Sequence, residues 1–169
     1  MRTKTFIITL ILLSLFVSSC KKYEDGPLIS LKSKNSRLTG EWKLVSYTYE
    51  TTTNDVTTTI SSFNGTTMEE FQNSYPYAHS LIINKDGTYT SKETKNYFTQ
   101  GFSSNWSWFS GSKNKNQLYL GINDLYSIKK LTNEDLVLTK HFSWQTYDYN
   151  SMEIDGLTTE SYIWIYEKQ

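Results

Sequence analysis

Apolar and polar side chains alternate with a period of two along most of the chain, which is the pattern of half-buried β-strands. Near the C-terminus, Tyr162, Trp164 and Tyr166 fall on one face, and Ile163 and Ile165 fall on the other. The same alternation marks segments 41–52, 56–62, 81–90, 106–109, 118–120 and 136–144. Aromatic and β-branched residues, which suit a pleated surface, dominate these segments. We therefore predict an all-β fold with eight or nine strands.

Turn-forming residues separate the predicted strands at intervals of roughly 8 to 12 residues, as expected for a sandwich or barrel. The turn signals are Asn54-Asp55, Asn64-Gly65, Asp86-Gly87, Gly111-Ser112, Gly121 with Asn123-Asp124, Asn133-Glu134-Asp135 and Asp155-Gly156. Asp86-Gly87 lies between two β-rich runs and predicts a hairpin, because glycine adopts positive φ without steric cost. One stretch, Thr67–Asn73, has a possible helix N-cap with Glu70 three residues beyond it, so a short helix or lid is an open alternative there.

The first twenty residues have the organisation of a secretory signal. Arg2 and Lys4 precede an apolar run, Phe6–Val17, and two serines then lead to Cys20. A membrane-spanning helix needs about 17 to 25 residues, and this run has only 12. The pattern resembles a bacterial lipobox, which predicts cleavage before Cys20 and a diacylglyceryl anchor on its thiol.

Cys20 is the only cysteine of the 169 residues. The alternative, a plain secretory signal with an incidental cysteine, would leave an exposed and unpaired thiol in an exported protein. We therefore divide the chain into a signal peptide (1–19), a lipidated cysteine with a flexible tether (20–37) and one folded domain (38–169). Lys21 is not the aspartate that often marks inner-membrane retention, so we expect the outer membrane of a Gram-negative bacterium, on its periplasmic or surface side.

The charge of the mature chain argues against nucleic acid as a partner. Removing residues 1–19 takes away Arg2 and Lys4 but no acidic residue, so 15 basic residues face 17 acidic ones and the formal charge is −2. Phosphate binding requires a basic stripe, whereas the lysines here are scattered. The longest basic cluster, Lys32–Arg37, falls in the tether, and we interpret it as a solvated linker or as a contact with anionic head groups.

No set of residues in the sequence indicates catalysis, a metal or a cofactor. A zinc site needs three or four suitably spaced ligands, and we interpret His79 and His141 as strand-edge or surface residues. Asn84–Thr88 has only part of a calcium-loop pattern. Glycosidase chemistry needs two facing carboxylates, and the adjacent residues Glu69 and Glu70 would point in different directions on a short helix. We therefore interpret them as a solvated face. We therefore expect a protein that is not an enzyme and binds no metal or cofactor.

Four segments together resemble a known family. They are Leu38-Thr39-Gly40-Glu41-Trp42-Lys43-Leu44, Leu81–Tyr89, Trp106-Ser107-Trp108 and Tyr126–Leu138. Their order, after a lipobox and a spacer, is similar to that of small lipocalin-like lipoproteins of Gram-negative bacteria. The resemblance implies an antiparallel up-and-down barrel of about eight strands.

In that family the tryptophan of G-x-W closes the barrel floor, and Trp42 occupies the matching position in this sequence. The arginine that usually accompanies it near the last strand is absent here, and Lys168 is the candidate substitute. The region Thr51–Tyr77 is long for a first loop, which predicts an extra strand pair or a lid.

Aromatic side chains are the main candidates for function, because tyrosine and tryptophan combine a large contact area with a polar tip. The candidate ligand-lining residues are Tyr47, Tyr49, Trp106, Trp108, Trp144 and Trp164. A barrel of this size is filled by its own side chains or holds one small ligand. The first hypothesis is a small apolar or amphipathic ligand inside the barrel. The alternative is a filled barrel that binds a protein or glycan through exposed aromatics. The sequence does not identify protein partners.

Overall fold

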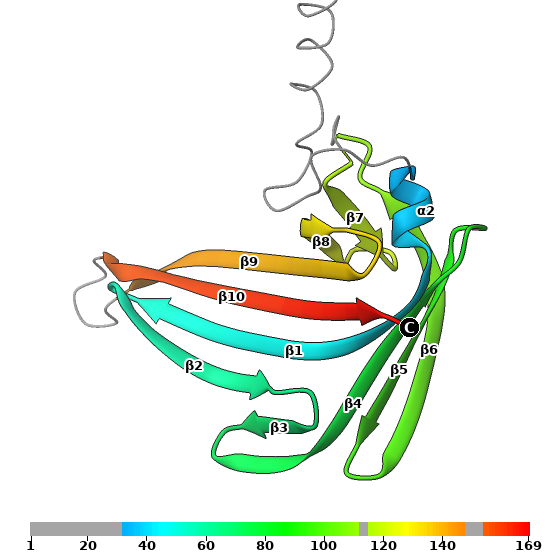
Figure 1. Ribbon diagram of the computed structural model, residues 1–169. Coiled ribbons are helices and arrows are strands. Elements are labelled where there is room, and N and C mark those ends of the chain that lie inside the picture. The colour runs from blue at the N-terminus through cyan, green and yellow to red at the C-terminus, as the bar shows by residue number, and fades with distance from the viewer. Residues whose placement is uncertain (1–31, 112–114, 148–153) are drawn as a thin grey trace, which may run out of the picture.

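The computed structural model describes residues 32–111, 115–147 and 154–169, so the predicted signal segment, Cys20 and most of the tether lie outside the described residues. The predicted all-β antiparallel barrel is confirmed, with ten strands in place of about eight (Figure 1). The elements are α2 (Lys34–Leu38), β1 (Gly40–Thr53), β2 (Val56–Phe63), β3 (Thr67–Glu70), β4 (Asn73–Ile83), β5 (Thr88–Lys95), β6 (Phe98–Trp108), β7 (Gln117–Leu120), β8 (Leu125–Leu131), β9 (Asp135–Tyr147) and β10 (Ile154–Lys168).

Two extra strands account for the difference in number. The beginning of β1 pairs directly with the end of β4, with Gly40 opposite Ile83 and Lys43 opposite Ser80. Further along, from Tyr47 to Thr53, the same edge of β1 pairs with β2 instead. Eight strands, β1 and β4 to β10, therefore close one end of the barrel, and β2 and β3 are inserted between β1 and β4 at the other end. This insertion is the strand pair that the long Thr51–Tyr77 region predicted.

The short helix considered for Thr67–Asn73 is wrong. Residues Thr67–Glu70 form strand β3, which pairs with both β2 and β4. Phe71 and Gln72 then make a two-residue turn with φ of 47° and 70°. Long-range pairing on both edges of the segment outweighs the local capping signal. Pro76 is accommodated in β4 because the pairing with β5 begins only at Tyr77.

The last residues of the expected tether are structured. Lys34–Leu38 form the one-and-a-half-turn helix α2, whose N-cap Ser33 accepts a hydrogen bond from the Ser36 backbone at 3.1 Å. Arg37 and Leu38 are buried. The Arg37 guanidinium donates to the Leu131 carbonyl at 3.0 Å, so α2 is held across the closed end of the barrel (Figure 1). Within the described part of the chain, no helix is long and apolar enough to cross a membrane.

Trp42 lies in the core at this closed end. Its side chain is completely buried, and its indole Nε1 donates to the Leu38 carbonyl at 2.7 Å. The Lys168 ammonium lies 4.9 Å from the centre of its ring, so a lysine stands where the family resemblance implied an arginine. Lys168 also donates to the carbonyls of Arg37 (3.0 Å) and Thr39 (2.7 Å), which ties the last strand to the C-terminal end of α2.

Gly40 makes this arrangement possible. Its φ of +136° disfavours any other residue, and a Cβ built on it would lie 2.6 Å from Lys168 Cε. The glycine of the L-x-G-x-W segment therefore leaves the room that the Lys168 side chain needs to reach Trp42.

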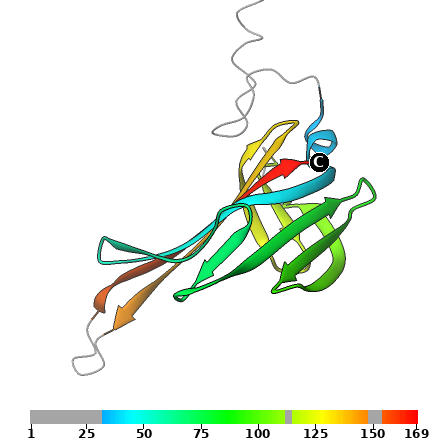
Figure 2. The ribbon, with the colours of Figure 1, turned by 60° about the horizontal axis from the view of Figure 1, so that its bottom comes forward.

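The opposite end of the barrel is open. β7 and β8 are short, so among the described residues β6 pairs only with β5 over residues 98–104, and β9 pairs only with β10 over residues 140–147. The long strands consequently diverge into two lobes, one of β2, β1, β10 and β9 and one of β4, β5 and β6 (Figures 1 and 2). We call the space between the lobes the mouth.

We predict that Trp42→Ala destabilises the protein by about 3–5 kcal/mol, because it removes a fully buried ring and leaves a cavity. Denaturant unfolding of the wild type and the variant would measure the loss. Trp144→Ala is the control, since Trp144 is 43% exposed and its loss should cost far less. A loss below about 1 kcal/mol for Trp42→Ala would show that Trp42 does not hold the closed end together.

Candidate functional site

A register shift in β1 turns its tyrosines toward the mouth. Leu44 lies opposite Tyr166 on β10, but Ser46 lies opposite Ile165, so Val45 is an extra residue in β1. A bulge of this kind reverses which residues face inward. Even-numbered Leu44 and odd-numbered Tyr47 consequently line the same interior pocket.

The pocket lies in the mouth and has a volume of about 220 Å³. Side chains from six strands line it: Leu44, Tyr47, Ser61, Met68, Glu70, Tyr75, Tyr77, His79, Glu93, Lys95 and Trp164. The volume is about that of seven water molecules in the liquid and is below the roughly 300–1,000 Å³ usual for drug-sized ligands. The barrel is therefore filled at its closed end and hollow near its mouth.

Aromatic rings form one side of the pocket. Trp164 on β10 is the central ring, with centroids 5.6 Å from Tyr47 and 5.3 Å from Tyr126. Tyr162 stacks on Trp164 at 5.7 Å, and Tyr49 stacks on Tyr162 at 4.4 Å, which continues the row outward. Burial raises the pKa of Tyr47, and the phenol stays protonated at neutral pH. These rings are held by one another and present a preformed surface.

A carboxylate, a phenol and an ammonium form a polar group at the pocket edge. The Tyr75 hydroxyl donates to Glu70 Oε2 at 2.8 Å, and Lys95 Nζ lies 3.2 Å from the same oxygen. Lys95 Nζ is also 4.5 Å from the centre of the Tyr75 ring. The hydrogen bond from Tyr75, followed by that from Lys95, lowers the pKa of Glu70. Glu70 is therefore ionised at neutral pH. Its side chain is 37% exposed, so it is solvated as expected and is in addition paired with Tyr75 and Lys95.

Glu93 supplies the second carboxylate. Its Oε2 accepts a hydrogen bond from Gln100 Nε2 at 2.7 Å, which orients it from the neighbouring strand. Burial, and then the nearby negative charge of Glu93, raise the pKa of Tyr77 well above its ordinary value. Glu70 and Glu93 thus line a single pocket although they come from separate hairpins.

His79 faces the barrel interior and not the strand edge or surface that we expected. Its Nε2 is 2.8 Å from Ser91 Oγ, and its Nδ1 is 3.2 Å from the Tyr166 hydroxyl. Burial lowers the pKa of His79, while the charge of Glu93 acts weakly in the opposite direction. The imidazole is therefore neutral at pH 7. His141, in contrast, is exposed on β9 and lies 3.0 Å from Ser161 Oγ.

The six aromatic candidates from the sequence lie in different places. Tyr47 and Trp164 line the pocket. Tyr49 lies beyond it, and its hydroxyl donates to Glu160 at 2.7 Å, an interaction that raises the pKa of Tyr49.

The other three candidates do not line the pocket. Trp106 is buried in the core and donates from Nε1 to the Asn84 carbonyl at 2.8 Å. Trp108 packs on Trp106 and donates to Asn35 Oδ1 at 2.8 Å, next to α2. Trp144 is partly exposed on the outer part of β9.

Sequence reasoning missed most of the polar side of the pocket. Tyr75, Tyr77 and His79 alternate in phase with buried Leu81 and Ile83, a signal that was available in the sequence. The grouping of Glu70, Glu93 and Lys95 depends on the pairing of β3, β4 and β5 and left no local signal.

A second depression of about 430 Å³ lies beside the β3–β4 turn. Backbone and side chains of residues 59–62 and 69–74 line it, including Phe71, which is 70% exposed. Within the described ranges, no group of three or more His, Cys, Asp or Glu side chains is placed to hold a metal ion.

The chain was compared with models of protein families and with curated protein sequences, and neither comparison gives a match. By its fold and its pocket, the protein is an antiparallel β-barrel with an aromatic and acidic pocket at its open end.

We predict that His79 makes stability fall as the pH falls below about 6.5, the ordinary histidine pKa. The pKa of His79 is lower in the folded protein than in the unfolded chain. Just below pH 6.5, His79 is therefore protonated in the unfolded chain but stays neutral in the folded protein, and protonation favours unfolding. The slope should reach at most about 1.4 kcal/mol per pH unit.

Denaturant unfolding between pH 7.5 and pH 5 would measure this slope, and His79→Gln should flatten it. The matched control His141→Gln should keep the wild-type slope, because that residue is exposed. Equal slopes in the wild type and His79→Gln would contradict the prediction.

Proposed function

We propose that this protein is a membrane-anchored, non-enzymatic binding protein of lipocalin-like design, whose barrel mouth takes a small amphipathic ligand. The observation that carries the proposal is the interior pocket of about 220 Å³ between two lobes of the barrel. Its rings supply apolar contact, and its hydroxyl and carboxylate groups supply orientation. The polar side chains are bonded to one another, as in the group of Tyr75, Glu70 and Lys95, which favours a preformed binding surface.

The size and polarity of the pocket favour an amphipathic ligand over a purely apolar one, the two classes that the sequence left open. A long acyl chain exceeds the pocket volume, and a purely apolar molecule would strip water from Glu70, Glu93 and Lys95 without replacing its hydrogen bonds. A compact molecule with one apolar part and one polar part satisfies both sides. Burial of its apolar part contributes roughly 25 cal/mol per Å².

The anchor is the second part of the proposal. The arrangement of charges, apolar run and Cys20 supports a diacylglyceryl attachment, and Lys21 supports the outer membrane. Acyl chains contribute roughly 0.8 kcal/mol per buried methylene, so two or three chains hold a protein stably.

The pocket is tested by filling it. Ser61 is buried on β2 and lines the pocket, so Ser61→Phe should place a ring inside it. Native mass spectrometry of the purified protein should show a co-purified small molecule on the wild type and its loss on Ser61→Phe. Ser62→Phe is the matched control, because Ser62 is the next residue on β2 and does not line the pocket.

Thermal unfolding of both variants would verify that they fold. Absence of any bound molecule from repeated wild-type preparations, or equal occupancy of Ser61→Phe, would contradict the proposal.

The anchor is tested by Cys20→Ser, which removes the acylated thiol. We expect the variant to move from the membrane pellet to the soluble fraction after ultracentrifugation of cell extracts. Ser19→Ala retains Cys20 and a small residue before it, and it should remain in the pellet. A Cys20→Ser variant that still pelleted with membranes would rule out the lipid anchor.

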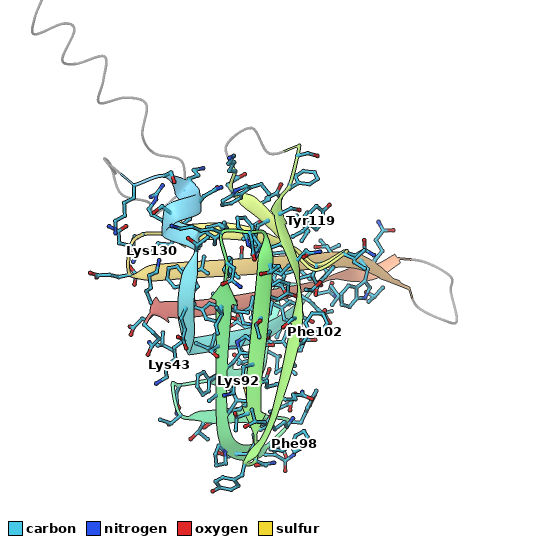
Figure 3. The ribbon with its side chains drawn as sticks, turned by 90° about the vertical axis from the view of Figure 1, so that its right-hand side faces the viewer. Lys43, Lys92, Phe98, Phe102, Tyr119 and Lys130 are labelled. Carbon is cyan, nitrogen blue, oxygen red and sulfur yellow. The ribbon has the colours of Figure 1, made fainter. Side chains whose placement is uncertain are left out.

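Exposed aromatic side chains and unpaired strand edges beside the mouth favour a second function, the binding of a protein or a glycan. Phe98 lies at the lower end of β6 and Phe102 midway along it (Figure 3), and both are more than half exposed. Among the described residues, the adjoining edge of β6 and the 140–147 edge of β9 have no strand partner, and open edges of this kind accept added strands. The β6 edge carries no charged residue, whereas the β9 edge carries Lys140. Retention of partner binding by Ser61→Phe would favour this function over the pocket.

A further inference from the structure

We propose that the pocket selects a cationic ligand, a small molecule whose polar end is an ammonium group and whose apolar part lies against the aromatic rings. This inference rests on the proposed pocket function and adds the charge of the ligand. It follows from three features of the lining: rings that attract cations, an excess of carboxylates, and a lysine of the chain already bound by the same chemistry.

The rings and the carboxylates lie around one space. Tyr47, Tyr77 and Trp164 line the pocket together with Glu93. The face of a tyrosine or tryptophan ring carries negative charge density and attracts an ammonium within about 6 Å. A carboxylate beside such rings adds a charge-assisted hydrogen bond. Both features favour the same kind of ligand.

The charge of the lining is negative. Its ionisable groups are Glu70, Glu93, Lys95 and His79, besides the tyrosines. His79 is neutral because it is buried, and Lys95 is already paired with Glu70 at 3.2 Å. Among the described lining residues, Glu93 is therefore the carboxylate without a cationic partner, and Gln100, which donates to it, is neutral. The Glu93 carboxylate would repel an anionic ligand, whereas it would attract a cationic ligand, which would neutralise its charge.

Lys95 shows how an ammonium is bound here. Its Nζ lies 4.5 Å from the centre of the Tyr75 ring and 3.2 Å from Glu70 Oε2. One aromatic ring and one carboxylate thus hold an ammonium at the edge of the pocket. Tyr77 on β4 and Glu93 on β5 form a second pair of phenol and carboxylate in the same pocket, and among the described residues no ammonium of the lining is ion-paired with Glu93.

The experiment compares three probes of nearly equal shape and different charge: 2-phenylethylammonium, 2-phenylethanol and phenylacetate. Isothermal titration of the purified protein at pH 7 and low salt would give the three affinities. We expect the ammonium to bind at least about tenfold more tightly than the alcohol, and phenylacetate to bind most weakly.

Two substitutions locate the effect. Glu93→Gln keeps the size of the side chain and should remove the advantage of the ammonium over the alcohol, while affinity for the alcohol is retained. Lys95→Gln should tighten ammonium binding by about threefold, because it removes a like charge and releases Glu70. The matched controls are Glu69→Gln and Lys92→Gln, which change exposed residues that do not line the pocket and should leave all three affinities as in the wild type.

The outcomes separate the two proposals. If the alcohol binds as tightly as the ammonium, or phenylacetate binds most tightly, the cation preference is wrong and the pocket function stands. If Glu93→Gln binds the ammonium as the wild type does, Glu93 is not its partner and the inference fails. If none of the three probes binds, the pocket function fails together with the inference.

Discussion

The way β1 changes its partner determines the shape of the whole barrel. Gly40–Lys43 pair with β4, and after the extra residue Val45 the same edge pairs with β2. From Trp42 to Thr53, apart from the extra residue Val45, the other edge of β1 pairs with β10. One end of the barrel is consequently closed by eight strands, and the other is widened by an inserted pair. A β-bulge bends a strand and increases its twist, so the extra residue both redirects β1 and turns its tyrosines inward.

The closed and open ends of the barrel are stabilised in different ways. At the closed end, Trp42 belongs to one core cluster with buried leucines, and Lys168 donates to the carbonyls at the end of α2 while its ammonium lies over the indole. At the mouth, no equivalent plug exists in the described residues, and the polar lining is satisfied by bonds such as those of Glu70 with Tyr75 and Lys95. Buried polar groups are costly unless they are paired. Glu70 and Lys95 also keep 37% and 49% of their side chains exposed, so water as well as pairing stabilises the charges in the pocket.

The sequence predicts the barrel far better than it predicts the pocket, for a physical reason. Alternation and turn residues are local, so the β1–β2 turn at Asn54-Asp55 and the hairpin at Asp86-Gly87 are found where they were predicted. The pocket depends on the register between strands, which places Glu70, Glu93 and Lys95 together. Local signals even mislead at Thr67–Asn73, where a capping pattern favoured a helix and pairing on two edges produced β3. Trp106 was a reasonable ligand candidate by type, but its register places it in the core.

The position of α2, where the described chain begins, is compatible with a pocket that would face away from the proposed anchor. The described chain enters through α2, which lies across the closed end, whereas the β3–β4 and β5–β6 turns lie at the far end of the molecule (Figure 1). A protein held by a lipid upstream of α2 is held on the side of its floor. Glu70 and Lys95, which adjoin those two turns, then line the end that points away from the attachment. Under the proposed function, attachment and binding would use opposite ends of one barrel, so neither would require the closed-end contacts of Trp42 and Lys168 to change.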